Sequence, residues 1–139
     1  MKRFVLDASV ALAWFIDNPT PPLAERIRQA LLQGGKAVVP ALWHPEMANG
    51  LVVAERRGTL SAAGTAQAIE QIGLLLGPTI ERAVDVVSIK QALGTARTFQ
   101  LTAYDAVYLE TALRQELPLA TLDRQLLTAA SKAGVEIVS

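Results

Sequence analysis

The 139-residue sequence contains no cysteine and only one histidine, His44. The absence of cysteine excludes a disulfide framework, a thiolate metal site and a cysteine nucleophile. A single histidine excludes a histidine-pair ribonuclease, and it disfavours zinc hydrolases, which usually use two or three. A serine–histidine nucleophile would have to use His44 itself. Carboxylates are therefore the main side chains left for acid, base or metal chemistry.

The sequence also lacks an excess of charge of either sign. Its 13 Asp and Glu residues balance its 13 Lys and Arg residues, so the formal net charge is zero. The globally basic composition that often marks nucleic-acid-binding proteins is absent. A charged ligand must therefore be recognised by charge concentrated at one place.

No apolar run is long enough to cross a membrane. Lys2 and Arg3 precede the apolar stretch Phe4–Ile16, as in a secretory signal, but Asp7 interrupts that stretch. A charge is costly in a segment that inserts into a bilayer. The uninterrupted remainder, residues 8–16, is too short to span one. We therefore predict a cytoplasmic protein with no membrane segment.

The pattern of apolar residues predicts an α/β fold. Four short apolar stretches have the composition of buried parallel strands: Arg3–Leu6, Ala37–Val39, Leu119–Thr121 and Glu136–Val138. Six helices are predicted between them from apolar spacing, caps and stop residues: Leu23–Leu31, Glu46–Arg57, Ser61–Leu76, Ser88–Phe99, Ala103–Gln115 and Arg124–Lys132. This alternation predicts a central parallel sheet flanked by helices, although residues 79–87 match neither pattern.

Four acids stand where such a sheet would present a ligand site. Asp7 directly follows the first predicted strand, and Glu46 follows the second by a few residues. Asp123 follows the third, whereas Asp105 stands near the start of a predicted helix. In open parallel sheets, ligands bind beyond the carboxyl ends of the strands. We therefore expect these four side chains to meet at one edge of the sheet.

Helix capping offers a simpler explanation for each acid taken singly. Asp7 and Asp123 could be N-caps, and Glu46 could stabilise the positive end of a helix dipole. Asp105 stands three residues after Thr102, in a spacing close to that of a capping box. Capping alone does not require the four helices to start on the same side, whereas a shared site does. The presence of all four acids at such positions therefore favours a shared ligand site over capping alone.

A cluster of carboxylates needs a counter-charge. Two carboxylates ~4 Å apart repel each other by roughly 4 kcal/mol at an effective dielectric constant near 20. The cluster must take up either a proton or a cation. Oxygen ligands without cysteine or histidine suit Mg²⁺ or Mn²⁺, which act on phosphate oxygens in many enzymes. The sequence thus predicts metal-dependent chemistry on a phosphate or phosphodiester.

Four sequence blocks, in order along the chain, resemble a known family. They are Val5–Val10, Val39–Asn49, Leu101–Tyr108 and Leu117–Asp123. At these residues the sequence resembles the PIN domain family, and within it the ribonuclease toxins of VapBC toxin–antitoxin modules. The resemblance implies a single PIN-like domain over residues 1–139 and Mg²⁺- or Mn²⁺-dependent endoribonuclease activity on RNA. It also implies a homodimer inhibited by a cognate VapB-type antitoxin.

The resemblance also implies roles for individual residues. Asp7 and Asp105 would be the central metal ligands, and Glu46 and Asp123 would complete the catalytic acidic pocket.

Four further residues are candidates around this pocket. Ser9 and Thr121 would orient carboxylates or water through their hydroxyl groups, although both also suit local caps and turns. Asn49 lies three residues after Glu46 on the same helix face and would hold that acid or touch RNA. Arg124 is the best-placed cation for an RNA phosphate.

Two other functions fit part of the sequence. Asp7 after the first strand also resembles the nucleophile of phosphoaspartyl enzymes, but Ser9 occupies the position of their second aspartate. None of the four lysines follows a strand as those enzymes require: Lys2, Lys36, Lys90 and Lys132. A non-catalytic domain that binds RNA or protein is the other alternative.

Tyr104 and Tyr108 are expected to pack in the core rather than to stack on bases.

Overall fold

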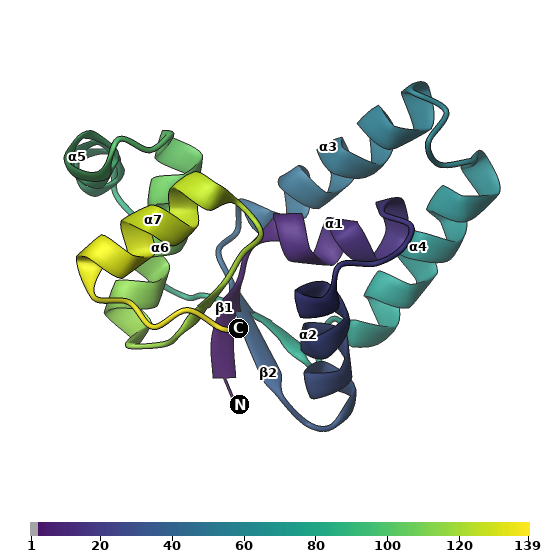
Figure 1. Ribbon diagram of the computed structural model, residues 1–139, viewed down its shortest axis with the longest axis horizontal. Helices are drawn as coiled ribbons and strands as arrows, with labels where there is room; N and C mark the ends of the chain where they lie inside the picture. Colours follow the sequence, from purple (N-terminus) through teal and green to yellow (C-terminus); the bar gives the residue numbers. More distant parts are fainter. Residues whose placement is uncertain (1–2) are drawn as a thin grey trace.

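The computed structural model describes residues 3–139 and contains a parallel sheet of four strands (Figure 1). The strands are β1 (Arg3–Leu6), β2 (Lys36–Val39), β3 (Ile80–Arg82) and β4 (Leu119–Ala120). Their order in the sheet is β3-β2-β1-β4, and every pairing is parallel. The predicted α/β fold with a central parallel sheet is therefore confirmed.

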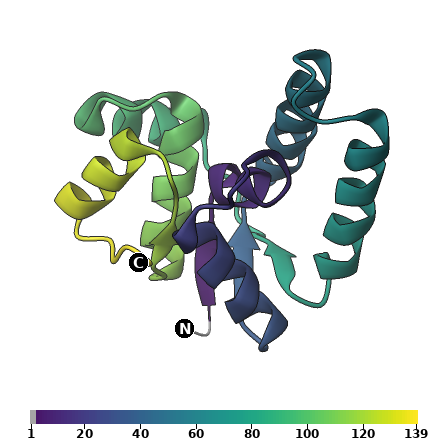
Figure 2. The same cartoon turned by 45° about the vertical axis from the view of Figure 1, so that its right-hand side comes forward.

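The helices form two groups on either side of the sheet. They are α1 (Ala8–Ile16), α2 (Pro22–Leu32), α3 (Trp43–Arg56), α4 (Ala62–Leu75), α5 (Ile89–Phe99), α6 (Ala103–Gln115) and α7 (Arg124–Ala133). Figures 1 and 2 show α1–α4 on one side of the molecule and α5–α7 on the other, with β1 between the two groups. Within residues 3–139, no helix is long and apolar enough to cross a bilayer.

The centre of the core is β1. Phe4, Val5 and Leu6 are completely buried, because helices cover both faces of this strand and other strands pair with both of its edges. A strand covered on both faces is apolar at every position, which explains why its sequence is a continuous run rather than an alternation.

Two parts of the sheet differ from the prediction. Residues 79–87, which matched no pattern, contain β3, an edge strand in which Ile80 is buried while Glu81 and Arg82 are exposed. Such a strand has no apolar run to detect. The predicted strand Glu136–Val138 is wrong, because only an isolated bridge joins Ile137 to β4. Two backbone hydrogen bonds to Leu119 hold this segment in place.

The helix carrying Glu46 starts earlier than predicted. It begins at Trp43, so Pro45 lies within its first turn rather than at its start. The N–H groups of a first turn have no partner inside the helix, and proline is therefore tolerated there.

Helices α1 and α3 approach each other closely at Gly50. A Cβ atom at Gly50 would lie 2.4 Å from Cδ1 of Leu12, so only glycine fits without movement of that side chain. This contact lies near the middle of both helices and packs α3 against α1.

Candidate active site

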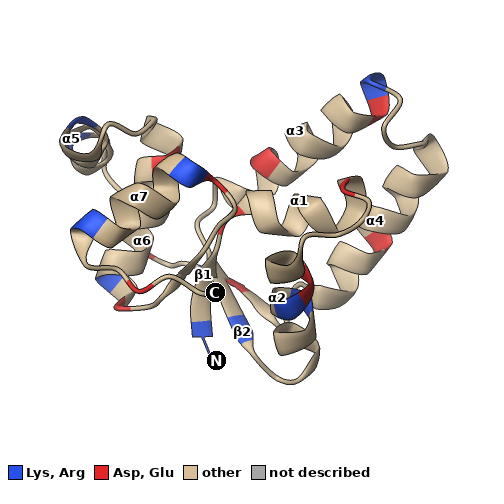
Figure 3. Cartoon of the chain, viewed as in Figure 1, with Lys and Arg blue, Asp and Glu red and all other residues tan. Residues whose placement is uncertain are grey.

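The four acids predicted from the sequence line one cavity. Asp7, Glu46, Asp105 and Asp123 face a space of about 540 Å³. Each comes from a different element: Asp7 connects β1 to α1, Glu46 and Asp105 lie in the first turns of α3 and α6, and Asp123 precedes α7. Figure 3 shows acidic positions gathered near the centre of the molecule, where these elements meet. The parallel topology therefore brings the four carboxylates together.

Two hydroxyl groups hold the carboxylate of Asp7, which is only 5% exposed. Ser9 Oγ and Thr121 Oγ1 donate to the same oxygen, Asp7 Oδ2, at 2.7 and 2.6 Å. Ser9 Oγ in turn accepts from the backbone N–H of Leu122 at 3.1 Å, and Thr121 Oγ1 accepts from that of Asp123 at 3.0 Å. The orientation of Asp7 is thus fixed by residues from both ends of the chain.

Helix capping explains the positions of only some of the four acids. Asp7 is the N-cap of α1, but its side chain makes no capping hydrogen bond, so the capping explanation is wrong there. Asp123 Oδ1 accepts from the backbone N–H of Leu126 at 2.9 Å and does cap α7. Helix α6 is capped by Thr102 Oγ1, which accepts from the N–H of Asp105 at 3.1 Å. The Asp105 carboxylate accepts no hydrogen bond within residues 3–139.

Glu46 is bound by a residue that the sequence assigned only to packing. Tyr108 is completely buried, as predicted, and its hydroxyl also donates to Glu46 Oε1 at 2.6 Å. The sequence did indicate that Tyr108 could lie near the acids, because it stands three positions after Asp105 and so shares its face of α6.

The negative charge at the cavity is costly. Burial raises the pKa of Asp7 and of Glu46 above their ordinary values. Burial, together with the charges of Asp123, Asp7 and Glu46, raises the pKa of Asp105 to about 6. In the part of the chain that the structure describes, no Lys or Arg forms an ion pair with these acids; the pairs are Arg3–Glu81, Arg28–Glu25 and Arg114–Glu110.

The donor set suits a hydrated divalent cation. Across residues 3–139, no three acidic or histidine side chains lie close enough to enclose a metal ion directly. The four carboxylates instead surround the cavity, and no described lysine, arginine or histidine lines it. Mg²⁺ usually keeps several of its waters and binds through one or two carboxylates. A hydrated Mg²⁺ or Mn²⁺ ion therefore fits both the oxygen donors that line the cavity and their unbalanced charge.

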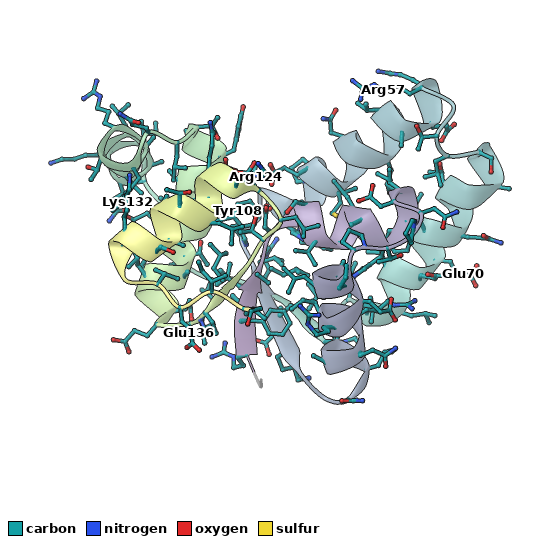
Figure 4. All side chains as sticks on the ribbon, viewed as in Figure 1. Arg57, Glu70, Tyr108, Arg124, Lys132 and Glu136 are labelled. Carbon is teal, nitrogen blue, oxygen red and sulfur yellow. The ribbon has the colours of Figure 1, made fainter. Side chains whose placement is uncertain are left out.

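Other candidates occupy the rim. Asn49 is exposed and lines the cavity, but it forms no hydrogen bond with Glu46 within residues 3–139. Tyr104 is 63% exposed and also lines the cavity, so the packing predicted for it is wrong. Arg124 is exposed at the start of α7, directly after Asp123 (Figure 4).

The lack of a lysine in the described lining counts against phosphoaspartyl chemistry.

Comparison with known proteins identifies the family. The model of the PIN domain family matches residues 4–132, which is nearly the whole chain. The chain belongs to the PIN domain family. This confirms the resemblance read from the four sequence blocks, and the PIN domain found here has its four acids at the carboxyl edge of its sheet. No curated protein matches this PIN domain at the sequence level.

Solved structures share the fold of this PIN domain. PAE2754 from Pyrobaculum aerophilum is 23% identical with a TM-score of 0.71, covering 99% of this chain and 84% of its own. FitAcB from Neisseria gonorrhoeae is 19% identical with a TM-score of 0.62, covering 98% and 96%. VapBC2 from Rickettsia felis, bound to a DNA fragment from its promoter, is 12% identical with a TM-score of 0.59, covering 97% and 96%.

Proposed function

We propose that this PIN domain is an endoribonuclease that hydrolyses RNA phosphodiesters with the help of Mg²⁺ or Mn²⁺. The observation that carries the proposal is the convergence of four carboxylates on one cavity, with no described basic side chain to balance them. Repulsion among the four carboxylates is energetically unfavourable, and a domain with a purely structural or interaction role would have no use for it. PIN domains are generally nucleases, and the acids suit that chemistry.

The residues of the acidic cavity would have different roles in hydrolysis. Asp7 and Asp105 would hold the cation, with Glu46 and Asp123 completing its surroundings. When bound, the cation would stabilise charge on the phosphate oxygens and lower the pKa of a water molecule. Ser9 and Thr121 keep the Asp7 carboxylate oriented, because both donate to one of its oxygens. An ionised carboxylate of the cavity would accept the proton of the attacking water as its oxygen bonds to phosphorus. The ester P–O bond would break in the same displacement, and the leaving ribose oxygen would take a proton from solvent.

RNA cleavage should depend on a divalent cation. Wild-type protein is expected to cleave single-stranded RNA with Mg²⁺ or Mn²⁺ and to lose this activity in EDTA. The melting temperature should rise with the cation, because an ion at 100 times its Kd adds about 2.7 kcal/mol to the free energy of unfolding. Cleavage assays and melting curves on the same samples measure both effects. Cleavage that persists in EDTA would contradict the metal mechanism, whereas metal binding without any cleavage would favour a non-catalytic domain.

We further propose that this PIN domain acts in the cytoplasm as the toxin of a type II toxin–antitoxin module. The proposal is supported by the VapBC-like sequence blocks and by the fold shared with VapBC2 and FitAcB. A VapB-type antitoxin would be the inhibitory partner and a homodimer the expected assembly. In the cleavage assay, a small antitoxin protein encoded beside this chain is expected to inhibit the wild type.

Arg124 should contribute to RNA binding through a phosphate. With the four acids neutralised, 13 basic residues remain against nine other acidic ones, which favours an RNA partner. Figure 4 shows Arg124 at the start of α7 and Lys132 toward the other end of that helix, so Lys132→Gln is a matched control. In an Asp105→Asn background, Arg124→Gln is expected to weaken RNA binding several-fold and to lower the salt slope by about 0.7. Fluorescence anisotropy at several salt concentrations measures both, and equal affinities of the two variants would contradict this role.

A further inference from the structure

Two tyrosines on α6 stand four positions apart but lie in opposite environments. Tyr104 is mostly exposed on the rim of the cavity, whereas Tyr108 is completely buried. The buried hydroxyl reaches Glu46 on α3, with 2.6 Å between Tyr108 Oη and Glu46 Oε1. Within residues 3–139, this is the only hydrogen bond that joins α3 to α6. The two helices belong to the opposite groups seen in Figures 1 and 2.

The hydrogen bond from Tyr108 anchors the Glu46 side chain. In the part of the chain that the structure describes, its carboxylate accepts no other hydrogen bond, so Oε2 has no donor there, and Glu46 lines the cavity. A glutamate has three rotatable side-chain bonds and adopts many orientations unless a partner fixes one of them. A phenol is ordinarily protonated in the neutral range, so the Tyr108 hydroxyl donates and the Glu46 carboxylate accepts.

We propose that Tyr108 is a positioning residue that holds the Glu46 carboxylate at the acidic cavity, with one oxygen left for a divalent cation. The inference rests on the proposed function, and it adds a residue that would touch neither the cation nor the RNA. Groups that orient a metal ligand typically change metal affinity by 10- to 100-fold when they are removed.

The direct test is Tyr108→Phe, which deletes the hydroxyl and keeps the buried ring. Melting temperature is followed while Mg²⁺ or Mn²⁺ is titrated, and the half-saturating concentration is compared with that of the wild type. We expect this concentration to rise about 10-fold or more. Thr111→Val is the matched control, because it removes another buried hydroxyl from α6, one that donates to the backbone oxygen of Val107. Its metal response should equal that of the wild type.

A double-mutant cycle separates positioning from simple packing. Glu46→Gln is expected to weaken the metal response, and adding Tyr108→Phe should then cause little further change, because the residues act as one unit. Effects of the two substitutions that simply add would overturn the proposal. Glu46→Asp provides a second variant in which the tyrosine is untouched, and it should also weaken metal binding by withdrawing the carboxylate from the hydroxyl. An undiminished metal response in that variant would likewise overturn the proposal.

The outcomes also distinguish this inference from the proposed function. If the wild type shows no metal-dependent rise in melting temperature, the metal-dependent function itself is wrong. If the wild type responds and Tyr108→Phe responds equally well, only the positioning role is wrong.

Discussion

Replacing Asp105 with asparagine is expected to reduce RNA cleavage at least about 100-fold and to make the metal-free protein more stable. Loss of a group that only orients a metal ligand already costs 10- to 100-fold, so loss of a ligand should cost more. Stability should increase because the substitution removes a charge that burial and three neighbouring acids disfavour. Single-turnover cleavage and metal-free melting curves measure the two effects.

The combination of the two changes is what distinguishes a metal site from a structural role. Asp85→Asn is a suitable control, because Asp85 is exposed and does not line the cavity. Asp7→Asn should also abolish cleavage, while its amide oxygen can still accept from Ser9 and Thr121. A variant of Asp105 that loses stability and keeps its cleavage activity would contradict the proposed site.

The metal-free protein is expected to melt at a lower temperature at pH 7.5 than at pH 5. Folding raises the pKa of Asp105 from 3.8 to about 6, so between these values the folded state keeps a proton that the unfolded state has lost. The free energy of unfolding therefore falls as the pH rises through this window and stays low above it. One pKa unit corresponds to about 1.4 kcal/mol, and pH 5 lies only about one unit below the raised pKa of Asp105. Solvent around the half-buried carboxyl should therefore reduce the change in the free energy of unfolding between pH 5 and pH 7.5 to roughly 1 kcal/mol.

A shift of this size changes the melting temperature by several degrees in a domain of this length. Differential scanning fluorimetry at constant ionic strength measures it, and Asp105→Asn should lose most of the dependence on pH. Saturating Mg²⁺ should shrink or reverse the trend, because metal binding requires the ionised carboxylate. A melting temperature that climbs between pH 5 and 7.5 in EDTA would contradict the charge repulsion described for the cavity.

The backbone arrangement of the site could be predicted because it depends on short-range signals. Apolar runs followed by Asp7 and Asp123 mark strand ends, and parallel pairing brings strand ends to one edge. The edge strand Ile80–Arg82 could not be found in this way, since one face of it meets solvent and only Ile80 is buried.

Side-chain contacts across the site were less predictable. Tyr104 and Tyr108 lie in one sequence block, yet only Tyr108 is buried, because it belongs to the core cluster and its hydroxyl reaches Glu46 on α3. The bond from Thr121 to Asp7 joins residues 114 positions apart, and no local pattern encodes such a distance. The spacing of the carboxylates likewise depends on rotamers, which the order of residues does not specify.

The pairing of β1 with β4 affects when the acidic cavity forms during folding. The pairing of β1 with β2 closes a loop of about 30 residues, whereas its pairing with β4 must bring together segments more than 110 residues apart. Contacts of large sequence separation carry a greater entropic cost and tend to form late in folding. Until β4 docks, one edge of β1 is unpaired and Asp7 lacks the hydroxyl of Thr121. Closing the sheet thus also completes the surroundings of Asp7, and a chain in which β4 has not docked lacks the complete acidic cavity.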